Sequence, residues 1–399
     1  MWVWVFYSSV APMRLPSWLA LPALVASQAV VNVPVGASTF KILHISDVHF
    51  HPQETTCRDV EPSEFPCTHE NSTQMIHALI EKEKPSLVAF TGDAIDHDSD
   101  TPRHAMDVLY GTVDVTSQPW AASLGNHESQ VQNMTREAVY SHILTMPSLS
   151  THGPVADSPG NFYVDLVQEG NVATRLFFFD SRDDLEMSVS DAQLEWFANL
   201  TSSLPAAPAL AFYHIPLAEY ETAVRAGQPI KGGLREQISA DKPNPRTFQA
   251  LKDGGVIAGF CGHDHTNDFC VSWEGVQLCY EGSPGFGAYG YCGPLKQACV
   301  ARRARVTELW MDSGQLTAVH SWKRVDGGGA SAGAKVDAEQ LWPSLAGHHP
   351  SAEAVAEPYA HKLPSSEGRV AKSVDELAAL VQHKQLSARA PAPIRIAPS

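Results

Sequence analysis

The chain has 399 residues, 44% of them hydrophobic, and a formal net charge of −16 at pH 7. This length is enough for one large domain or two ordinary ones, each with a substantial core. The acidic balance and the lack of a long Lys/Arg run argue against non-specific nucleic-acid binding, so we expect no nucleic-acid partner.

Residues 1–37 are expected to be a signal peptide. The apolar run LPSWLALPALVASQAVV is interrupted by two prolines and a glutamine, so we expect no stable membrane span. Small residues provide two plausible cleavage sites, at Ser27 and Ala29 or at Val35 and Ala37. The alternative is a membrane anchor formed by the same segment.

Residues 38–326 alternate strand and helix patterns and are expected to form a single α/β domain. The first strand is KILHIS (residues 41–46), followed by a helix from Asn71 that ends at Pro85 and a second strand, SLVAFTGD (86–93). This βαβ unit predicts two parallel neighbouring strands. Further strands are predicted at 120–124, 161–167, 174–180, 209–214 and 256–261, and a helix at 190–200 begins with a capping box of Ser190 and Gln193.

The later part of the domain has a more antiparallel pattern. A hairpin is predicted near 269–273 and 276–280, followed by strands at 303–311 and 315–322. From residue 327 the composition changes to Ala, Gly, Pro and Ser with little apolar periodicity, so residues 327–399 are predicted to be a flexible tail.

Cysteines and glycosylation sequons favour a secretory route. N-x-S/T sequons begin at Asn71, Asn133 and Asn199. Pairing neighbouring cysteines leaves Cys261 alone in a predicted strand; the candidate disulfides are Cys57 with Cys67, Cys270 with Cys279 and Cys292 with Cys299. Sequence alone does not fix this connectivity. We expect a secreted protein or one of the secretory-pathway or vacuolar lumen.

Five predicted strands are each followed by a polar side chain suited to bind a metal ion. The candidate residues after the successive strands are Asp47 and His49, then Asp93, then Asn126, then His214, and finally His263 and His265. Ligands of α/β sheets bind beyond the carboxyl ends of the strands, so these loops can share one crevice. Asp, Asn and His without Cys suit divalent metals that prefer nitrogen and oxygen.

The stretches ILHISDVHFH, FTGD, GNHE, YHIP and GHDHTNDFC resemble the signature of the calcineurin-like metallophosphoesterases. Within that family, the flanking sequence is similar to the short, single-domain purple-acid-phosphatase-like proteins of plants and fungi. The resemblance covers roughly residues 40–322. It implies a sandwich of two β-sheets flanked by helices in four layers, with a dinuclear metal site at the carboxyl edge of the strands.

The resemblance also implies a ligand set for each ion. One metal ion is expected on Asp47, His49, Asp93 and His265, and the other on Asp93, Asn126, His214 and His263, with Asp93 bridging both. The ions are expected to be Fe, Zn or Mn. Purple members have an iron-binding tyrosine where this chain has Asp96, so no tyrosinate–Fe(III) colour is expected. Plant relatives without that tyrosine are sometimes labelled inactive, for lack of a ligand that His49 could replace here.

The implied activity is hydrolysis of a phosphomonoester, in a small molecule or a phosphoprotein, by a metal-bridging hydroxide. His127 is expected to stabilise the phosphate or protonate the leaving alcohol, with Glu128 orienting His127. One alternative is a phosphodiesterase acting on nucleotides or phospholipid headgroups. Another, of a different class, is an inactive metal-loaded binding module.

Other polar and aromatic residues near these motifs have less specific interpretations. His51, Asp96 and His97 are expected to be solvated loop residues. Asp264 either orients a ligand imidazole or is exposed. The aromatic residues of the glycine-rich loop could line the substrate mouth, although packing beneath that loop is their commoner role; they are Phe286, Tyr289 and Tyr291.

Overall fold

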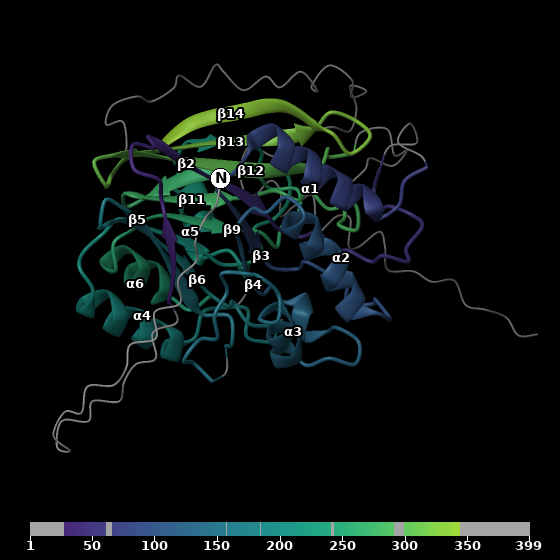
Figure 1. The fold of residues 1–399 in the computed structure, drawn as a ribbon, viewed down its shortest axis with the longest axis horizontal. Helices are drawn as coiled ribbons and strands as arrows, with labels where there is room; N and C mark the ends of the chain where they lie inside the picture. Colours follow the sequence, from purple (N-terminus) through teal and green to yellow (C-terminus); the bar gives the residue numbers. More distant parts are fainter. Residues whose placement is uncertain are drawn as a thin grey trace, which may run out of the picture.

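The computed structural model describes residues 28–60, 66–156, 158–183, 185–240, 243–290 and 299–343. They form two β-sheets between two groups of helices (Figure 1), which confirms the predicted fold class. The six-stranded sheet has the order β14-β13-β12-β2-β3-β4, with β2 Thr39–Ile45, β3 Leu87–Thr91, β4 Trp120–Ser123, β12 Arg303–Asp312, β13 Gln315–Asp326 and β14 Ala332–Trp342.

The second sheet has eight strands in the order β1-β5-β6-β7-β9-β11-β10-β8. Its strands are β1 Gln28–Asn32, β5 Phe162–Gln168, β6 Asn171–Phe178, β7 Ala209–Phe212, β8 Ile230–Lys231, β9 Val256–Cys261, β10 Cys270–Trp273 and β11 Val276–Tyr280. The helices are α1 Glu70–Glu83, α2 Pro102–Asp114, α3 Arg136–Ile143, α4 Asp191–Ser203, α5 Ala218–Arg225 and α6 Thr247–Asp253, and a 3₁₀ turn, η2, covers His127–Ser129.

The predicted βαβ unit is β2–α1–β3. The two strands pair in parallel, with Ile42 opposite Leu87. Helix α1 ends where Lys84 adopts a left-handed conformation directly before Pro85, whose ring cannot continue the helix. The predicted hairpin is also present, because β10 and β11 pair antiparallel.

Alternation along the central strands builds three layers of core. In β3, Val88 and Phe90 face α1 and α2, whereas Leu87 and Ala89 face the other sheet. The other face of the eight-stranded sheet packs on α4, α5 and α6, where Phe177 belongs to the same cluster as Trp196 and Phe197 of α4. Figure 1 shows α1, α2 and α3 on one side and α4 and α6 on the other. The result is the four-layer sandwich that the sequence predicted.

The folded domain extends beyond both predicted boundaries. Residues 28–32, assigned to the signal segment, form β1 and pair in parallel with β5. Residues 332–342, assigned to the flexible tail, form β14 and pair antiparallel with β13, and Leu341 is buried. Both are edge strands of their sheets, held largely by backbone hydrogen bonds that a side-chain pattern does not reveal. The remaining parts of the predicted signal and tail, 1–27 and 344–399, lie outside the described residues.

Two of the expected disulfides are formed, Cys57–Cys67 and Cys270–Cys279, and Cys261 is free and buried. Cys299 is also disulfide-bonded. Its predicted partner, Cys292, lies outside the described residues.

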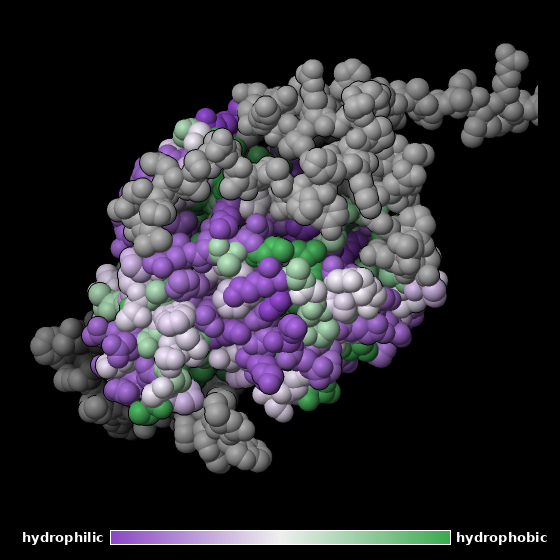
Figure 2. Space-filling view, turned by 90° about the horizontal axis from the view of Figure 1, so that it is seen from above, coloured by the Kyte–Doolittle hydropathy of each residue, from purple (hydrophilic) through white to green (hydrophobic). Residues whose placement is uncertain are grey.

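The surface seen in Figure 2 is mainly hydrophilic, with apolar residues in small groups. The large hydrophobic residues exposed in the described ranges are far apart in sequence; they are Val35, Val115, Leu185 and Trp310. Scattered exposed residues of this kind are normal for a folded protein. Within the described ranges, no helix combines the length and apolar character that crossing a membrane requires.

Candidate metal centre

The seven predicted metal-ligating side chains meet at the carboxyl ends of five strands. Three strands of the six-stranded sheet and two of the eight-stranded sheet contribute, in the order β2, β3, β4, β7 and β9. The residues brought together are Asp47, His49, Asp93, Asn126, His214, His263 and His265. A single cluster therefore holds three carboxylate or amide groups and four imidazoles.

Tight backbone geometry holds these loops in place. Four of the seven residues have left-handed backbone conformations, with φ of 53° at Asp47, 47° at His49, 48° at Asp93 and 73° at His263. Each such conformation costs about 1–3 kcal/mol outside glycine, and such residues cluster at functional sites. The site therefore includes four of the strained backbone positions of the described chain.

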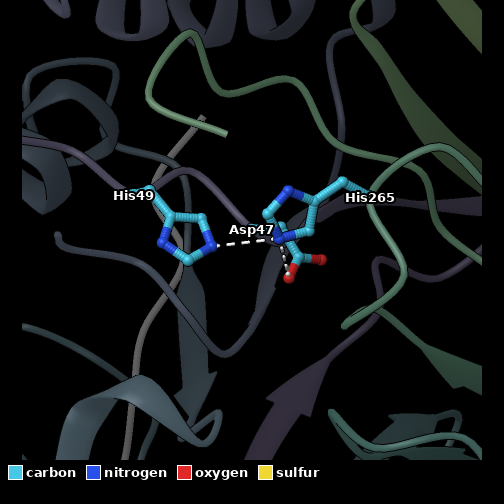
Figure 3. A group of neighbouring side chains, drawn as sticks. All are labelled: Asp47, His49 and His265. Atoms are coloured by element: carbon cyan, nitrogen blue, oxygen red, sulfur yellow. Dashed lines mark hydrogen bonds and ion pairs between the residues drawn. The ribbon is translucent and has the colours of Figure 1, made fainter. Parts of the chain in front are cut away.

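One group of donors consists of Asp47, His49 and His265 (Figure 3). The Nε2 atoms of His49 and His265 face each other at 3.1 Å, and Asp47 Oδ1 lies 3.5 Å from His265 Nε2. The Asp47 carboxylate also accepts hydrogen bonds from the Ser46 hydroxyl at 2.6 Å and from the His263 backbone N–H. Its orientation is thus fixed before any ion binds.

The second group consists of Asp93, His214 and His263, with Asn126 between the two imidazoles. Asn126 Oδ1 lies 3.1 Å from His214 Nε2 and 3.0 Å from His263 Nδ1. The Thr91 carbonyl lies 2.9 Å from His214 Nδ1 and accepts its N–H, which turns Nε2 toward Asp93 Oδ2 at 3.1 Å. This backbone contact selects the tautomer that a metal ligand needs.

Asp93 lies between the two groups. Its Oδ2 is 3.7 Å from His49 Nε2 and 3.1 Å from His214 Nε2, so one carboxylate oxygen faces donors of both groups. Its other oxygen accepts the backbone N–H of His127 at 2.9 Å. This is the geometry expected of a residue shared by two ions.

Burial and mutual proximity set the protonation of the site. Burial lowers the pKa of His49 to about 4 and that of His263 to about 3, so both imidazoles are neutral near pH 7 with a lone pair available. Burial also lowers the pKa of His214, but the carboxylates of Asp93 and Asp47 more than offset it and raise that pKa to about 10. His214 is therefore protonated when no ion is bound, and its Nε2–H faces the Asp93 carboxylate. A metal cation could replace this proton between the two side chains. The donor set and its charges therefore fit a pair of divalent cations.

His127 lies at the rim, partly exposed, with Nε2 3.8 Å from Asp93 Oδ2. Its Nδ1 lies 2.9 Å from Gln130 Oε1, so Nδ1–H donates and Nε2 faces the site. Burial lowers the pKa of His127, but the Asp93 carboxylate outweighs it, and the net shift is upward. An imidazolium at this position can donate a proton.

Glu128 contacts the backbone of the two neighbouring loops and does not contact the ring of His127. Its carboxylate accepts backbone N–H groups from Asp93 at 3.1 Å, Ala94 at 2.9 Å and Gly125 at 2.7 Å. It therefore ties the loop after β3 to the loop after β4. The prediction that Glu128 orients His127 is corrected here: the side chain that holds the His127 ring is Gln130.

Asp264 is buried, and its Oδ2 accepts hydrogen bonds from the Ser239 backbone N–H at 3.0 Å and the Tyr280 hydroxyl at 2.5 Å. Of the two alternatives predicted for Asp264, orientation of a ligand imidazole or exposure to solvent, exposure is therefore wrong. It anchors the segment between His263 and His265 to β11.

Two loop residues expected to be solvated are more enclosed. Asp96 is buried, and its backbone N–H donates to the Phe50 carbonyl at 3.0 Å. The His97 ring stacks on His127 with centroids 4.9 Å apart. Contacts between separate loops bury Asp96 and partly cover His97, and such contacts leave no local sequence pattern.

The aromatic residues of the glycine-rich loop have different roles. Phe286 is buried in the core beneath α1. Tyr289 stacks on His265 with centroids 3.8 Å apart, and its hydroxyl donates to Glu236 at 2.8 Å. Tyr291 lies outside the described residues.

Comparisons with known proteins identify the family of the chain. Residues 40–267 match the calcineurin-like phosphoesterase family, and the chain belongs to it. Over 351 residues it is 31% identical to "Probable inactive purple acid phosphatase 14" of Arabidopsis thaliana, covering 76% of this chain and 84% of that protein. It is 28% identical over 320 residues to "Phosphatase DCR2" of Saccharomyces cerevisiae, covering 72% of this chain and 54% of that protein.

Among solved structures, the chain is similar to a dimetal phosphatase from Danio rerio, with 14% identity, a TM-score of 0.49, and coverage of 76% of this chain and 99% of that one. The relatives confirm the resemblance to purple-acid-phosphatase-like proteins of plants and yeast. The family uses a dinuclear metal site, and this chain has candidate residues for it.

Proposed function

We propose that the protein is a metal-dependent phosphomonoesterase with a dinuclear centre. The observation that carries this proposal is the convergence of seven nitrogen and oxygen donors, from five strand ends, into two groups that share Asp93. One ion would be held by Asp47, His49, Asp93 and His265, and the other by Asp93, Asn126, His214 and His263. Fe, Zn and Mn all suit this donor set. Asp96 stands in place of an iron-binding tyrosine, so the loaded protein should lack the purple colour.

The bound ions would activate the attacking water and offset the charge on the phosphoryl oxygens. The chain's own contribution is orientation and proton transfer. His127, with Nδ1 held by Gln130, directs Nε2 toward the side of the site where the leaving alcohol departs and donates its proton there. Glu128 keeps the loops of Asp93 and Asn126 at a fixed separation.

Replacing His127 by Ala tests its role. General acid catalysis contributes about 10²–10⁴-fold, so turnover of an alkyl phosphate, whose leaving alcohol needs a proton, should fall by a factor in this range. Metal content should remain that of the wild type, because His127 is not among the proposed ligands. Unchanged turnover would remove His127 from the mechanism.

The activity itself is tested by assaying p-nitrophenyl phosphate and bis(p-nitrophenyl) phosphate, with and without a chelator, together with metal analysis of the purified chain. We expect chelator-sensitive hydrolysis of the monoester. Preferential hydrolysis of the diester would instead identify a phosphodiesterase. Hydrolysis of neither would contradict the proposal and favour a metal-loaded binding module, in line with the "probable inactive" names of the plant relatives.

We further propose that the protein is secreted or resides in the lumen of the secretory pathway or vacuole, after removal of an N-terminal signal that ends before β1, because cleavage at either predicted site would remove part or all of that strand. The disulfides Cys57–Cys67 and Cys270–Cys279 support an oxidising compartment. Asn133 and Asn199 are exposed, as a glycan requires, whereas Asn71 is partly buried and accepts a hydrogen bond from the Thr68 N–H. An unchanged electrophoretic mobility after N-glycosidase treatment of the native protein would contradict glycosylation.

A further inference from the structure

We propose that His97 is a positioning residue that holds the ring of His127 in the orientation needed to protonate the leaving group. This inference rests on the proposed function and adds a residue to it. His97 lies in the loop after β3, four positions beyond Asp93, and its ring stacks nearly parallel on His127, at an interplanar angle of 14°.

The contacts of His127 explain why a stacked ring is needed. The hydrogen bond from Nδ1 to Gln130 restrains one edge of the ring but leaves it free to swing about that bond. His49 approaches edge-on, at 73° and a centroid distance of 5.1 Å. The flat contact with His97 is the one that opposes rotation of the ring out of its plane. Nε2 is thereby kept near Asp93.

His97 is itself fixed by bonds between the two loops. The Gln132 backbone N–H donates to the His97 carbonyl at 3.3 Å, and Gln132 Nε2 donates to the Asp98 carbonyl at 3.2 Å. On the other side, the Ile95 strand bridge to Phe50 ties the loop to the segment after β2. The His97 and His127 loops thus move as one unit, which a positioning contact requires.

The stack on His127 is the close contact of the His97 ring. The His97 side chain is 31% exposed, and its Nδ1 is buried with no hydrogen-bond partner among the described residues. Two carboxylates face the ring at longer range: Nδ1 lies 3.7 Å from Asp96 Oδ1, and Nε2 lies 3.7 Å from Asp98 Oδ1. Neither is at hydrogen-bond distance, so the flat contact with His127 sets the plane of the ring.

The test compares His97→Ala with His97→Phe, which keeps a flat ring, and with His77→Ala, an exposed histidine of α1, as the control. All variants are full-length and metal-loaded. His97→Ala should lower kcat for an alkyl phosphate by about 10-fold or more, a part of the ~10²–10⁴-fold that an acid catalyst supplies, with KM and metal content unchanged. The loss should be smaller for p-nitrophenyl phosphate, whose leaving group departs without a proton. His97→Phe should retain most of the wild-type kcat.

Two further measurements make the outcome decisive. The double variant His97→Ala/His127→Ala should be no slower than His127→Ala alone, because both changes remove one function. Vanadate, which mimics the five-coordinate transition state, should bind more weakly to His97→Ala by calorimetry, while inorganic phosphate binds equally to both proteins.

Equal kcat values or vanadate affinities in His97→Ala and wild type would overturn the role of His97. So would a His97→Phe variant as slow as His97→Ala. A wild-type protein that hydrolyses no ester would overturn the proposed function and, with it, the role of His97; an active wild type with an equally active His97→Ala variant would overturn the role of His97 alone.

Discussion

At the scale of single residues, two glycines determine how closely the loops of the site can approach one another. A Cβ on Gly125 would overlap Asp93 Oδ1, and one on Gly262 would overlap Ser46 Oγ and Asp47 Oδ2. These approaches are far inside van der Waals contact. Both positions therefore need glycine because polar side chains of the site occupy the space of a Cβ, and not because of their backbone conformation.

Replacing Gly125 by Ala should accordingly displace the Asp93 carboxylate. We expect metal affinity to fall by about 10–100-fold, the loss typical of disturbed ligand orientation, and the free energy of unfolding to fall by about 1–3 kcal/mol. Metal titration and chemical denaturation measure the two effects. Gly111→Ala in α2 is the control: nothing lies within 4 Å of its Cβ, so stability should stay equal or rise by about 0.5–1 kcal/mol. Unaltered metal binding by Gly125→Ala would contradict the close approach.

Some residues of the site could be identified from the sequence, and others could not. The seven donor residues follow apolar strands in short motifs, so their type and position are visible locally. Gln130 and His97 act through side-chain contacts with His127, and the Thr91 contribution is a backbone carbonyl. Such contacts depend on how neighbouring loops pack, so no local sequence motif predicts them.

At the scale of elements, the central strands were predictable, as was the fully buried edge strand β4, whereas the edge strands β1, β8 and β14 were not. The central β3 is buried along its whole length and appears in the sequence as a continuous apolar run. In β14, by contrast, only Leu341 is fully buried, and the sequence AGAKVDAEQLW has no clear alternation. Its pairing with β13 relies on backbone groups that every residue has. The composition therefore resembled that of a tail.

If β14 is an integral strand, Leu341→Ala should destabilise the whole domain. Leu341 is 1% exposed and packs in the cluster between the sheets, where truncation of a leucine costs about 2–5 kcal/mol. Ala334→Ser, at an exposed position of the same strand, should change stability by less than about 0.5 kcal/mol. Denaturation curves compare the two. An unaffected midpoint in Leu341→Ala would mean that this segment does not contribute to the fold.

At the scale of the whole molecule, a buried ion cluster connects the two sheets. Asp268 precedes β10 of the eight-stranded sheet and is fully buried. It pairs with Arg235 at 2.7 Å, with Lys323 of β13 at 2.9 Å and with Arg303 of β12, so it faces two strands of the other sheet. Buried charges are tolerated only when paired, and here one carboxylate balances several cations.

Replacing Asp268 by Asn should therefore destabilise the protein by about 3–5 kcal/mol at pH 7, because the amide leaves buried cations uncompensated. The expected pH dependence has a definite sign. Burial raises the pKa of Asp268, but Arg303, Lys323 and Arg235 outweigh it and hold that pKa far below the ordinary value of 3.8. Near pH 4 the Asp268 carboxylate becomes protonated in the unfolded chain but stays ionised in the folded chain. The stabilisation is therefore present above that pH and is lost as the pH falls further.

Guanidinium unfolding at pH 7 and at pH 3.5 checks both parts of this prediction. The difference in unfolding free energy between wild type and Asp268→Asn should be largest at pH 7 and smaller at pH 3.5. Asp312→Asn, at an exposed position at the end of β12, serves as the matched control and should leave both values nearly unchanged. A difference that grows on acidification would show that the cluster does not hold Asp268 ionised in the folded state.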